Sequence, residues 1–451
     1  MSSSKQSEPS LIKKVSVTSN SDKTKKGELS SGTVRLMYFE SIMQDTIKAS
    51  VTFVDSGYRT GGNTEGTSYV QGLPITGEES VSIEFEDNNK QSIKVIMYVE
   101  QAPSIAEDTN KSSYNLHLTT AESFFNEKIR LNMRYDGNIT DNFKKIFTEN
   151  LKTDANLDFE ETSGEFNFIG NKKKPFYTLN WLSKKAQPNT DTKTPGFLFW
   201  QTSEGFKFRS IESLMKQKAK KTFIYNETPD NKGTNIPEGY DGKILAYNQE
   251  SDSDAIQKLK MGAKQTRIVL FDPWNCQYQV INNDKTDANT ETSGKKLPVG
   301  NEKFNVPNSG GTKDTISSRT TYYLLDTGTL PSGSGLGKGQ QQLTKSKNQN
   351  FEYAKIENQS IMQYNSLFAS KATITIAGDF SLHAGDTLFI DVPSPTSGKT
   401  DKVNPENGGL YIIADLCHYL STEGTYTKLN LVRNSIGRKG NPTSSKTSTE
   451  N

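Results

Sequence analysis

The sequence has few cysteines, histidines and hydrophobic residues. Its 451 residues include two cysteines and three histidines, and 32% of the chain is hydrophobic, with a mean hydropathy of -0.71. Cys276 and Cys417 alone cannot build a disulfide framework for a chain of this length, which favours synthesis in a reducing compartment. The low hydrophobic content predicts several small domains with large loops rather than one large core.

Long hydrophobic runs and an excess of one charge are also missing. No apolar segment approaches the ~20 residues that span a bilayer, and residues 1–26 lack the apolar centre of a signal peptide. The 54 basic and 52 acidic residues leave a net charge of +2. This balance indicates no strong attraction to nucleic acid or to an anionic membrane. We therefore expect a soluble protein that is made in a cytoplasm, with no membrane partner and no specific nucleic-acid partner.

The clearest structural pattern lies between Ala372 and Val432. Apolar segments at 373–376, 387–392, 410–414 and 425–432 are each bounded by Gly, Pro, Asn or Asp. The last segment alternates with the period of two that is typical of a strand. Short strands at this spacing predict an antiparallel sheet that curls into a small barrel or sandwich.

A similar pattern occurs near the N-terminus. Residues 73–78 lead into an apolar strand at 80–85, and residues 382–386 lead into one at 387–390. In both places an apolar residue precedes a turn of glycine and an acidic residue, and another strand follows. One interpretation is an internal repeat, with two similar β-barrels, one near each end of the chain. The alternative is that any two β-hairpins look alike.

The middle of the chain has a different character. Residues 140–151 place Phe143, Ile146, Phe147 and Leu151 on one helix face, with Thr140 as the N-cap. Further helices are predicted at 120–127, 178–186 and 210–215, and a hairpin is predicted at 196–202 with 205–210.

The sequence therefore predicts a mainly β fold with an α+β insert, two antiparallel β-barrel domains and smaller inserted domains. The predicted parts are a disordered N-terminal arm at 1–30, a first barrel at 31–102 with 205–235, an α+β domain at 103–204, a second barrel at 236–285 with 365–436, a polar insertion at 286–364 and a disordered C-terminal tail at 437–451.

The histidines and cysteines do not form a recognisable site. His117 and His383 lack metal-ligand spacing. His418 follows Cys417 directly, and neighbours on a strand point to opposite faces, so these two cannot easily share a metal. A thiol that faces the core is the favoured interpretation of Cys417.

Other candidate motifs also have structural explanations. The glycine-rich segment 333–339 lacks the Ser or Thr, the preceding strand and the following helix of a phosphate loop. The remaining candidates are the basic clusters at 172–174 and 216–221, interpreted as solvated surface rather than phosphate contacts, Asp252 and Asp254 at a helix start, Trp181, Trp200 and Trp274 as core aromatics rather than sugar platforms, and glycosylation sequons at Asn138 and Asn358. We predict no catalytic, metal or cofactor-binding residue, no cofactor and no enzymatic activity.

Four segments together resemble the central hub proteins of contractile-tailed bacteriophage baseplates. They are residues 35–41 with 47–57, residues 73–78, residues 199–210 and residues 378–437. Their order and spacing carry the resemblance, and the polar segment 282–350 departs from it.

The resemblance implies two tail-tube-like barrels in each subunit and a homotrimeric ring in the virion tail baseplate, assembled in the host cytoplasm. Such a ring adapts the hexameric tail tube, or the proteins that initiate it, to a trimeric spike. The implied partners are thus tube proteins on one face, a spike or tail lysozyme protein on the other, and other baseplate wedge proteins. The genome would pass through the ring without specific contacts.

Alternative functions remain open. The tryptophans are compatible with a carbohydrate- or receptor-binding β protein of the tail. The chain equally fits the hub of a related contractile injection machine. A peptidoglycan hydrolase is disfavoured, because no pair of carboxylates lies in a recognisable helical setting.

Overall fold

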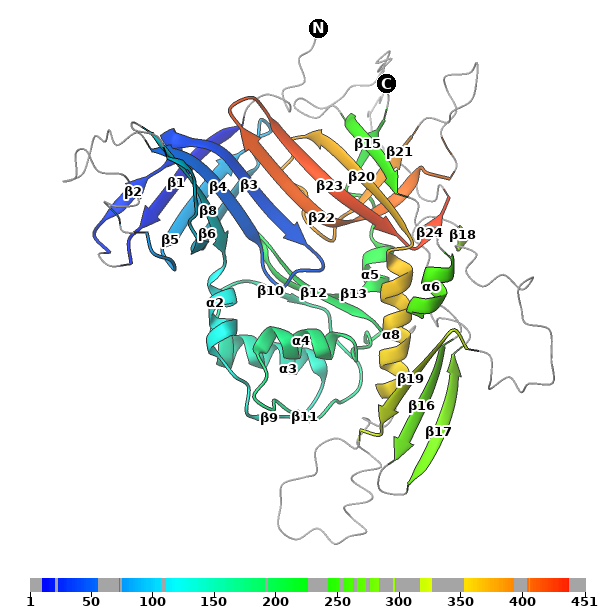
Figure 1. Ribbon diagram of the computed structural model, residues 1–451. Helices are drawn as coiled ribbons and strands as arrows, with labels where there is room; N and C mark the ends of the chain where they lie inside the picture. The colour runs from blue at the N-terminus through cyan, green and yellow to red at the C-terminus, as the bar shows by residue number, and fades with distance from the viewer. Residues whose placement is uncertain are drawn as a thin grey trace, which may run out of the picture.

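A computed structural model describes most of the chain. The described residues are 10–20, 23–55, 73, 75–107, 111–190, 194–225, 242–250, 255–262, 266–272, 276–283, 295–296, 317–326, 353–392, 404 and 406–437. The fold is mainly β, with a 14-stranded sheet in which all pairings but one are antiparallel, and with helices and small sheets beside it (Figure 1). The predicted fold class is confirmed.

The first half of the large sheet is built from N-terminal strands. They are β1 (Leu11–Thr18), β2 (Lys26–Glu28), β3 (Thr33–Ser41), β4 (Lys48–Asp55), β5 (Ser80–Glu86), β6 (Ser92–Gln101), β7 (Ser104–Glu107) and β8 (Ser112–Thr119), with the short 3-10 helix η1 (Ser30–Gly32) before β3. Their order is β3-β4-β8-β6-β5-β1-β2, and β7 pairs with β8 beside β6. We call this the first module.

The prediction of a disordered arm at 1–30 was wrong for its second half, because β1 and β2 belong to this sheet. Val15 and Val17 of β1 and the nearby Leu29 are completely buried in the core. The residues between them are polar, so the apolar content of the arm looks too low for a strand although the buried positions of β1 itself are apolar. Residues 1–9 lie outside the described residues.

The second half of the sheet comes mostly from the C-terminal part of the chain. Its strands are β14 (Lys221–Ile224), β15 (Ile244–Glu250), β20 (Ser370–Ala377), β21 (Thr387–Asp391), β22 (Gly409–Ser421) and β23 (Thr425–Arg433), in the order β15-β20-β23-β22-β21-β14. We call this the second module. The four strands predicted between Ala372 and Val432 are confirmed. The assignment of 205–235 to the first barrel was wrong at β14, which pairs in parallel with β21.

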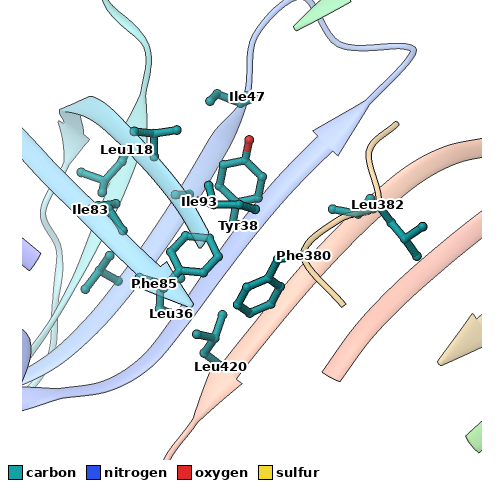
Figure 2. Close-up of a cluster of buried hydrophobic side chains, with 14 of the residues drawn as sticks. Leu36, Tyr38, Ile47, Ile83, Phe85, Ile93, Leu118, Phe380, Leu382 and Leu420 are labelled. Carbon is teal, nitrogen blue, oxygen red and sulfur yellow. The ribbon is translucent and has the colours of Figure 1, made fainter. Parts of the chain in front are cut away.

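The two modules join through β22. Its first residues pair with β21, and its last residues pair with β3 of the first module. One core cluster accordingly spans both modules. Figure 2 shows Phe380 of the second module facing Phe85 of the first, with ring centroids 4.9 Å apart. The modules therefore share one core.

Five strands of each module have the same order. Numbered along the chain, these strands are β3, β4, β5, β6 and β8 in the first module and β15, β20, β21, β22 and β23 in the second. In both modules the spatial order is first, second, fifth, fourth, third, and every neighbouring pair is antiparallel. The predicted internal repeat is confirmed at the level of strand connections.

Irregularities also fall at matching positions. The ladder between the first two strands has a bulge at Val34 in the first module and at Leu245 in the second. The ladder between the fourth and fifth strands is shifted just after Val99 and just after Ile413. Because a bulge bends a strand at a defined place, this coincidence favours a duplicated fold over an ordinary likeness between hairpins.

The α+β part lies beside the first module. Its elements are α2 (Ala121–Lys128), β9 (Arg134–Tyr135), α3 (Ile139–Lys145), the π-helical turn η2 (Ile146–Leu151), β10 (Leu157–Phe159), β11 (Phe168–Ile169), α4 (Pro175–Ser183), β12 (Phe197–Thr202), β13 (Gly205–Ser210) and α5 (Ile211–Lys216). The predicted hairpin is β12–β13, which pairs with β10 rather than with the first barrel. The boundary at 103 was wrong, because β7 and β8 belong to the first module.

Local signals explain most of these helices. Phe143, Ile146, Phe147 and Leu151 are buried together as predicted. The N-cap of α3 is Asn138, however, whose side chain accepts the backbone N–H of Asp141 at 2.7 Å. The predicted cap, Thr140, instead donates to the carbonyl of residue 160.

The remaining elements form a third part. They are α6 (Ala255–Met261), β16 (Thr266–Asp272), β17 (Gln277–Asn283), β18 (Lys295–Lys296), β19 (Arg319–Leu324), α8 (Tyr353–Leu367) and β24 (Ser435–Ile436). Strands β17-β16-β19 form a separate sheet next to α8. The assignment of β16 and β17 to the second barrel, as part of 236–285, was therefore wrong.

The helix α8 was missed inside the predicted polar insertion 286–364. Its buried positions include Asn358, Gln359, Ser360 and Gln363. The apolar residues of α8 therefore do not show the clear helical period that would have revealed it. Asn358 donates to the Thr266 hydroxyl of β16 at 2.7 Å, which compensates its burial. The rest of that insertion is described only at 295–296 and 317–326, and 438–451 of the predicted tail lie outside the described residues.

Candidate functional site at the junction of the two modules

The carboxylate of Glu40 lies where the two modules and the β12–β13 hairpin meet. Glu40 stands near the end of β3 with its side chain fully buried. It accepts hydrogen bonds from the Tyr38 hydroxyl at 2.8 Å, from the backbone N–H of Ser203 at 2.9 Å and from the backbone N–H of Ala384 at 2.9 Å. One side chain of the first module thus binds both the hairpin tip and the second module.

His383 adds an ionic contact to this junction. Its Nδ1 lies 3.2 Å from Glu40 and its Nε2 lies 3.7 Å from Glu204 of the hairpin tip. Burial lowers the pKa of His383, but the hydrogen bond and charge of Glu40 outweigh burial and raise that pKa above its usual value. Burial raises the pKa of Glu40, and the contacts with His383 and the backbone N–H groups bring it below its usual value. Both shifts favour the charged forms of the pair, in a largely dry environment.

Trp200 fixes the hairpin against the second module. Its Nε1 donates to the carbonyl of Ala384 at 3.0 Å, and the side chain is 2% exposed. The next residue, Gly385, has φ of +93°, and a Cβ there would lie 2.6 Å from the Trp200 ring. Close packing of Trp200 on the chain therefore requires glycine at 385.

The hairpin also contacts the first module. The Gln201 side-chain oxygen accepts from the backbone N–H of Ile47 at 3.3 Å and from the Thr120 hydroxyl at 3.2 Å. Trp200 of β12 thus binds the second module and its neighbour Gln201 binds the first. The hairpin therefore stabilises the relative position of the two modules.

Equivalent corners precede the third strand of each module. The N–H of Glu78 donates to the carbonyl of Val99 at 2.8 Å, and the N–H of Gly385 donates to the carbonyl of Ile413 at 2.9 Å. The predicted repeat had aligned Gly77 with Gly385, and the hydrogen bonds shift that alignment by one residue.

An acidic residue closes each corner. The carboxylate of Glu79 accepts from the N–H of Thr76 at 2.7 Å, three residues earlier. The carboxylate of Asp386 accepts in the same way from the N–H of His383 at 2.8 Å, and also binds the Lys220 ammonium at 2.8 Å. The corner is therefore a structural repeat, but its acidic residue in the first module is Glu79 and not the Glu78 of the predicted pattern.

Three of the four segments that carry the family resemblance meet at this junction. Glu40 comes from residues 35–41, Ser203 and Trp200 from residues 199–210, and His383 and Ala384 from residues 378–437. The fourth, residues 73–78, forms the corresponding corner of the first module. The sequence search for sites missed Glu40. Its only local signal is an acidic residue at an inward position of the alternating strand Leu36, Tyr38, Glu40.

The other histidines and the cysteines lie apart from this junction or beside it. The prediction that the Cys417 thiol faces the core was wrong, because its neighbour His418 occupies the inward face of β22 and Cys417 is half-buried on the opposite face. His418 is buried, its ring stacks on Tyr38, and its Nδ1 lies 2.9 Å from the Thr427 hydroxyl. Burial lowers the pKa of His418 to about 3 and raises that of Cys417 to about 11. His117 lies 3.2 Å from the Asn115 amide on β8, and Cys276 is exposed.

The basic clusters are largely paired with carboxylates. Lys216 pairs with Glu212 at 2.5 Å, and Lys221 pairs with Asp379 at 2.5 Å. In the other cluster Lys174 pairs with Glu127, and the ammonium of Lys173 lies 5.2 Å from the centre of the Tyr177 ring. Most of these lysines therefore already have a partner within the chain. This agrees with their interpretation as surface or structural groups rather than as phosphate contacts.

Trp181 and the two asparagines of the glycosylation sequons are packed into the structure or cap a helix. Trp181 is half-buried against Phe166 and Phe168. Asn138 caps α3 and Asn358 is buried in α8. Trp274, Asp252, Asp254 and the segment 333–339 lie outside the described residues. Across the described ranges, no group of three or more His, Cys, Asp or Glu side chains could hold a metal ion, and no helix is both long and apolar enough to cross a membrane.

The structure is similar to those of phage tail proteins. No family model and no curated protein matches the sequence. The 43 kDa tail protein of prophage MuSo2 from Shewanella oneidensis is 10% identical, with a TM-score of 0.49 over 94% of this chain and 98% of that chain. A tail protein from Neisseria meningitidis MC58 is 12% identical, with a TM-score of 0.49 over 93% and 96%. A type VI secretion component of E. coli is 7% identical, with a TM-score of 0.40 over 92% and 76%.

Proposed function

We propose that this protein is a structural virion protein, the homotrimeric central hub of a phage tail baseplate, which adapts the hexameric tail tube to a trimeric spike. The observation that supports it most directly is the duplicated module, with the same order of five strands and matching bulges in both copies. A threefold ring can match a sixfold partner only if each subunit offers two near-equivalent surfaces.

The junction supports the same function. A ring of six modules requires that the two modules of each chain keep one fixed relation. The ion pair of Glu40 and His383, the hydrogen bond of Trp200 and the shared core all act against relative movement. In this proposal the protein acts by its shape, without catalysis, catalytic residues or cofactors, and resides in the tail after assembly in the host cytoplasm.

The partners follow from the resemblance of the four segments to baseplate hubs. Tube or tube-initiator proteins would bind one face, a spike or tail lysozyme protein the other, and wedge proteins the periphery. The hub of a related contractile injection machine would use the same architecture. A carbohydrate platform at Trp200 is disfavoured, because that side chain is buried in the junction.

Light scattering coupled to size exclusion tests the proposal. Three chains of 50.1 kDa should elute as one species of about 150 kDa. A mass of one chain throughout the micromolar range, in buffers of low and moderate salt, would contradict a hub.

A further inference from the structure

We propose that neighbouring copies of the chain join by antiparallel pairing of β15 of one copy with β7 of the next. This seam, which rests on the proposed trimer, would repeat between chains the pairing of β3 with β22 that joins the modules within one chain. Its location follows from the strand match between the modules.

The internal contact uses the first strand of one module and the fourth strand of the other. The ladder runs from Ser41 opposite Asp415 to Arg35 opposite Ser421. In a ring of alternating modules, the first strand of the second module and the fourth strand of the first module would make the next contact. These are β15 and the strand that corresponds to β22.

That corresponding strand is β6 continued by β7. The matched shifts place Leu118 and Leu431 at equivalent positions, since each pairs with the last residue before its shift. Ser104 of β7 pairs with the residue four positions before Leu118, and His418 of β22 pairs with the residue four positions before Leu431. Strand β7 therefore matches the second half of β22, which is the half that pairs with β3.

The first strands can be matched in the same way. Ala49 pairs with Leu118 and Ala372 pairs with Leu431, so these two alanines are equivalent. On the opposite edge of its strand, Ala49 pairs with Tyr38 of β3. Ala372 pairs in the same way with Gln249 of β15. Gln249 of β15 thus corresponds to Tyr38 of β3.

These matches define the register of the seam. Tyr38 pairs with His418 in the internal ladder, and their rings stack with centroids 6.0 Å apart. Gln249 should therefore lie opposite Ser104 of the neighbouring copy.

One position along, Met37 pairs with Tyr419 in the internal ladder. Asn248 corresponds to Met37, because each comes directly before a residue of the matched pair Gln249 and Tyr38. Ala106 corresponds to Tyr419, because Ala106 pairs with the residue five positions before Leu118 and Tyr419 pairs with the residue five positions before Leu431. Asn248 should thus face Ala106 of the neighbouring copy.

Both edges are available within one chain. Among the described strands, β15 pairs only with β20 and β7 pairs only with β8. Leu245, Ala246, Asn248 and Glu250 on β15 are exposed. An exposed edge presents unpaired backbone groups that favour addition of another strand. The contact is head-to-tail, so each copy offers one β15 and one β7, and three copies can close a ring.

Chemical cross-linking tests this seam in the full chain. In a background of Cys276→Ser and Cys417→Ser, Ala106→Cys with Asn248→Cys should give covalent trimers with a short bismaleimide. The control Lys94→Cys with Asn248→Cys uses an exposed residue of β6 in the half that pairs with β5. We expect at least about tenfold more covalent product from the first pair. A second seam pair, Ser104→Cys with Gln249→Cys, replaces the first if that variant does not fold by circular dichroism.

Light scattering of the same samples separates the two proposals. A trimer that cross-links only through the seam pairs supports both. A trimer in which the seam pairs react no more than the Lys94 control overturns the seam and leaves the hub intact. A monomer at every concentration overturns the hub and the seam together.

Discussion

At the residue scale, Glu40 illustrates how a buried charge can define a fold. Removing a carboxylate from water is costly unless donors replace the solvent. Here the donors come from three separate parts of the chain, at Tyr38, at Ser203 and at the neighbours His383 and Ala384. The charge is satisfied only when both modules and the hairpin are in place, so it favours one arrangement over others.

The ion pair predicts how stability depends on pH. His383 has a raised pKa in the folded chain, so it retains its proton above pH 6.5 while the unfolded chain releases it. The stabilisation is complete below about pH 6.5 and is lost as the pH rises through the raised pKa, with a slope of up to about 1.4 kcal/mol per pH unit. Glu40, Glu204 and Asp386 are the charged groups that face the ring.

The variant His383→Gln keeps a donor but does not titrate, so its unfolding free energy should fall less between pH 6.5 and 9. Urea unfolding across that range measures the difference. His418 contributes equally to both proteins, because burial lowers its folded-state pKa to about 3 in each, so it cancels when the two profiles are compared. Parallel profiles for the two proteins would contradict a charged His383.

At the element scale, the matching corners show which parts of the repeat are shared and which are specific. Both modules use a glycine with positive φ and an acidic residue before the third strand. Only the second corner supports a tryptophan from another element. The first corner is a local turn, whereas the second also docks the β12–β13 hairpin.

Two glycine variants separate these roles. Gly385→Ala should cost about 2–4 kcal/mol, because it combines backbone strain with a clash on Trp200. Gly77→Ala has the same kind of strain at φ of +123° but meets nothing within 4 Å, so it should cost only about 1 kcal/mol. Chemical denaturation measures both, and equal losses would show that the Trp200 contact is unimportant.

The sequence predicted elements well where periodicity and burial agree. The strands between Ala372 and Val432 and the β12–β13 hairpin alternate clearly and were located. The helix α8 was missed because polar residues make up much of its buried face. The partners of β14 and β16 were assigned wrongly, because strand pairing depends on residues far along the chain and not on the pattern within the strand.

The junction was only partly predictable. The turn of glycine and acid at Gly385 and Asp386 was found from its pattern. Glu40 was not found, because an isolated carboxylate on a strand gives no local sign of the donors that surround it.

At the scale of the whole molecule, two modules share one core, and β7 and β15 are among the described strands that lie at an edge of the large sheet. The internal ladder of β3 and β22 shows that such edges can pair within this chain. A ring of three chains would close the remaining edges of β7 and β15, which limits the tendency of open edges to aggregate.

A trimer predicts that thermal stability depends on protein concentration. Association that involves only folded chains raises the melting temperature by mass action, so Tm should rise between about 1 and 100 µM. Differential scanning fluorimetry or calorimetry measures this shift, with a second scan rate as the control for irreversible unfolding. A constant Tm over that range would contradict assembly through folded edges.

The sequence alone determined the β class of this protein, the position of its most regular strands and the turn at Gly385 and Asp386, because periodicity and turn chemistry act over a few neighbouring residues. The tertiary structure decided which strands pair, placed Glu40 among its donors and showed that the two modules share strand order and bulges. Those features depend on contacts between residues hundreds of positions apart, and only the folded chain brings them together.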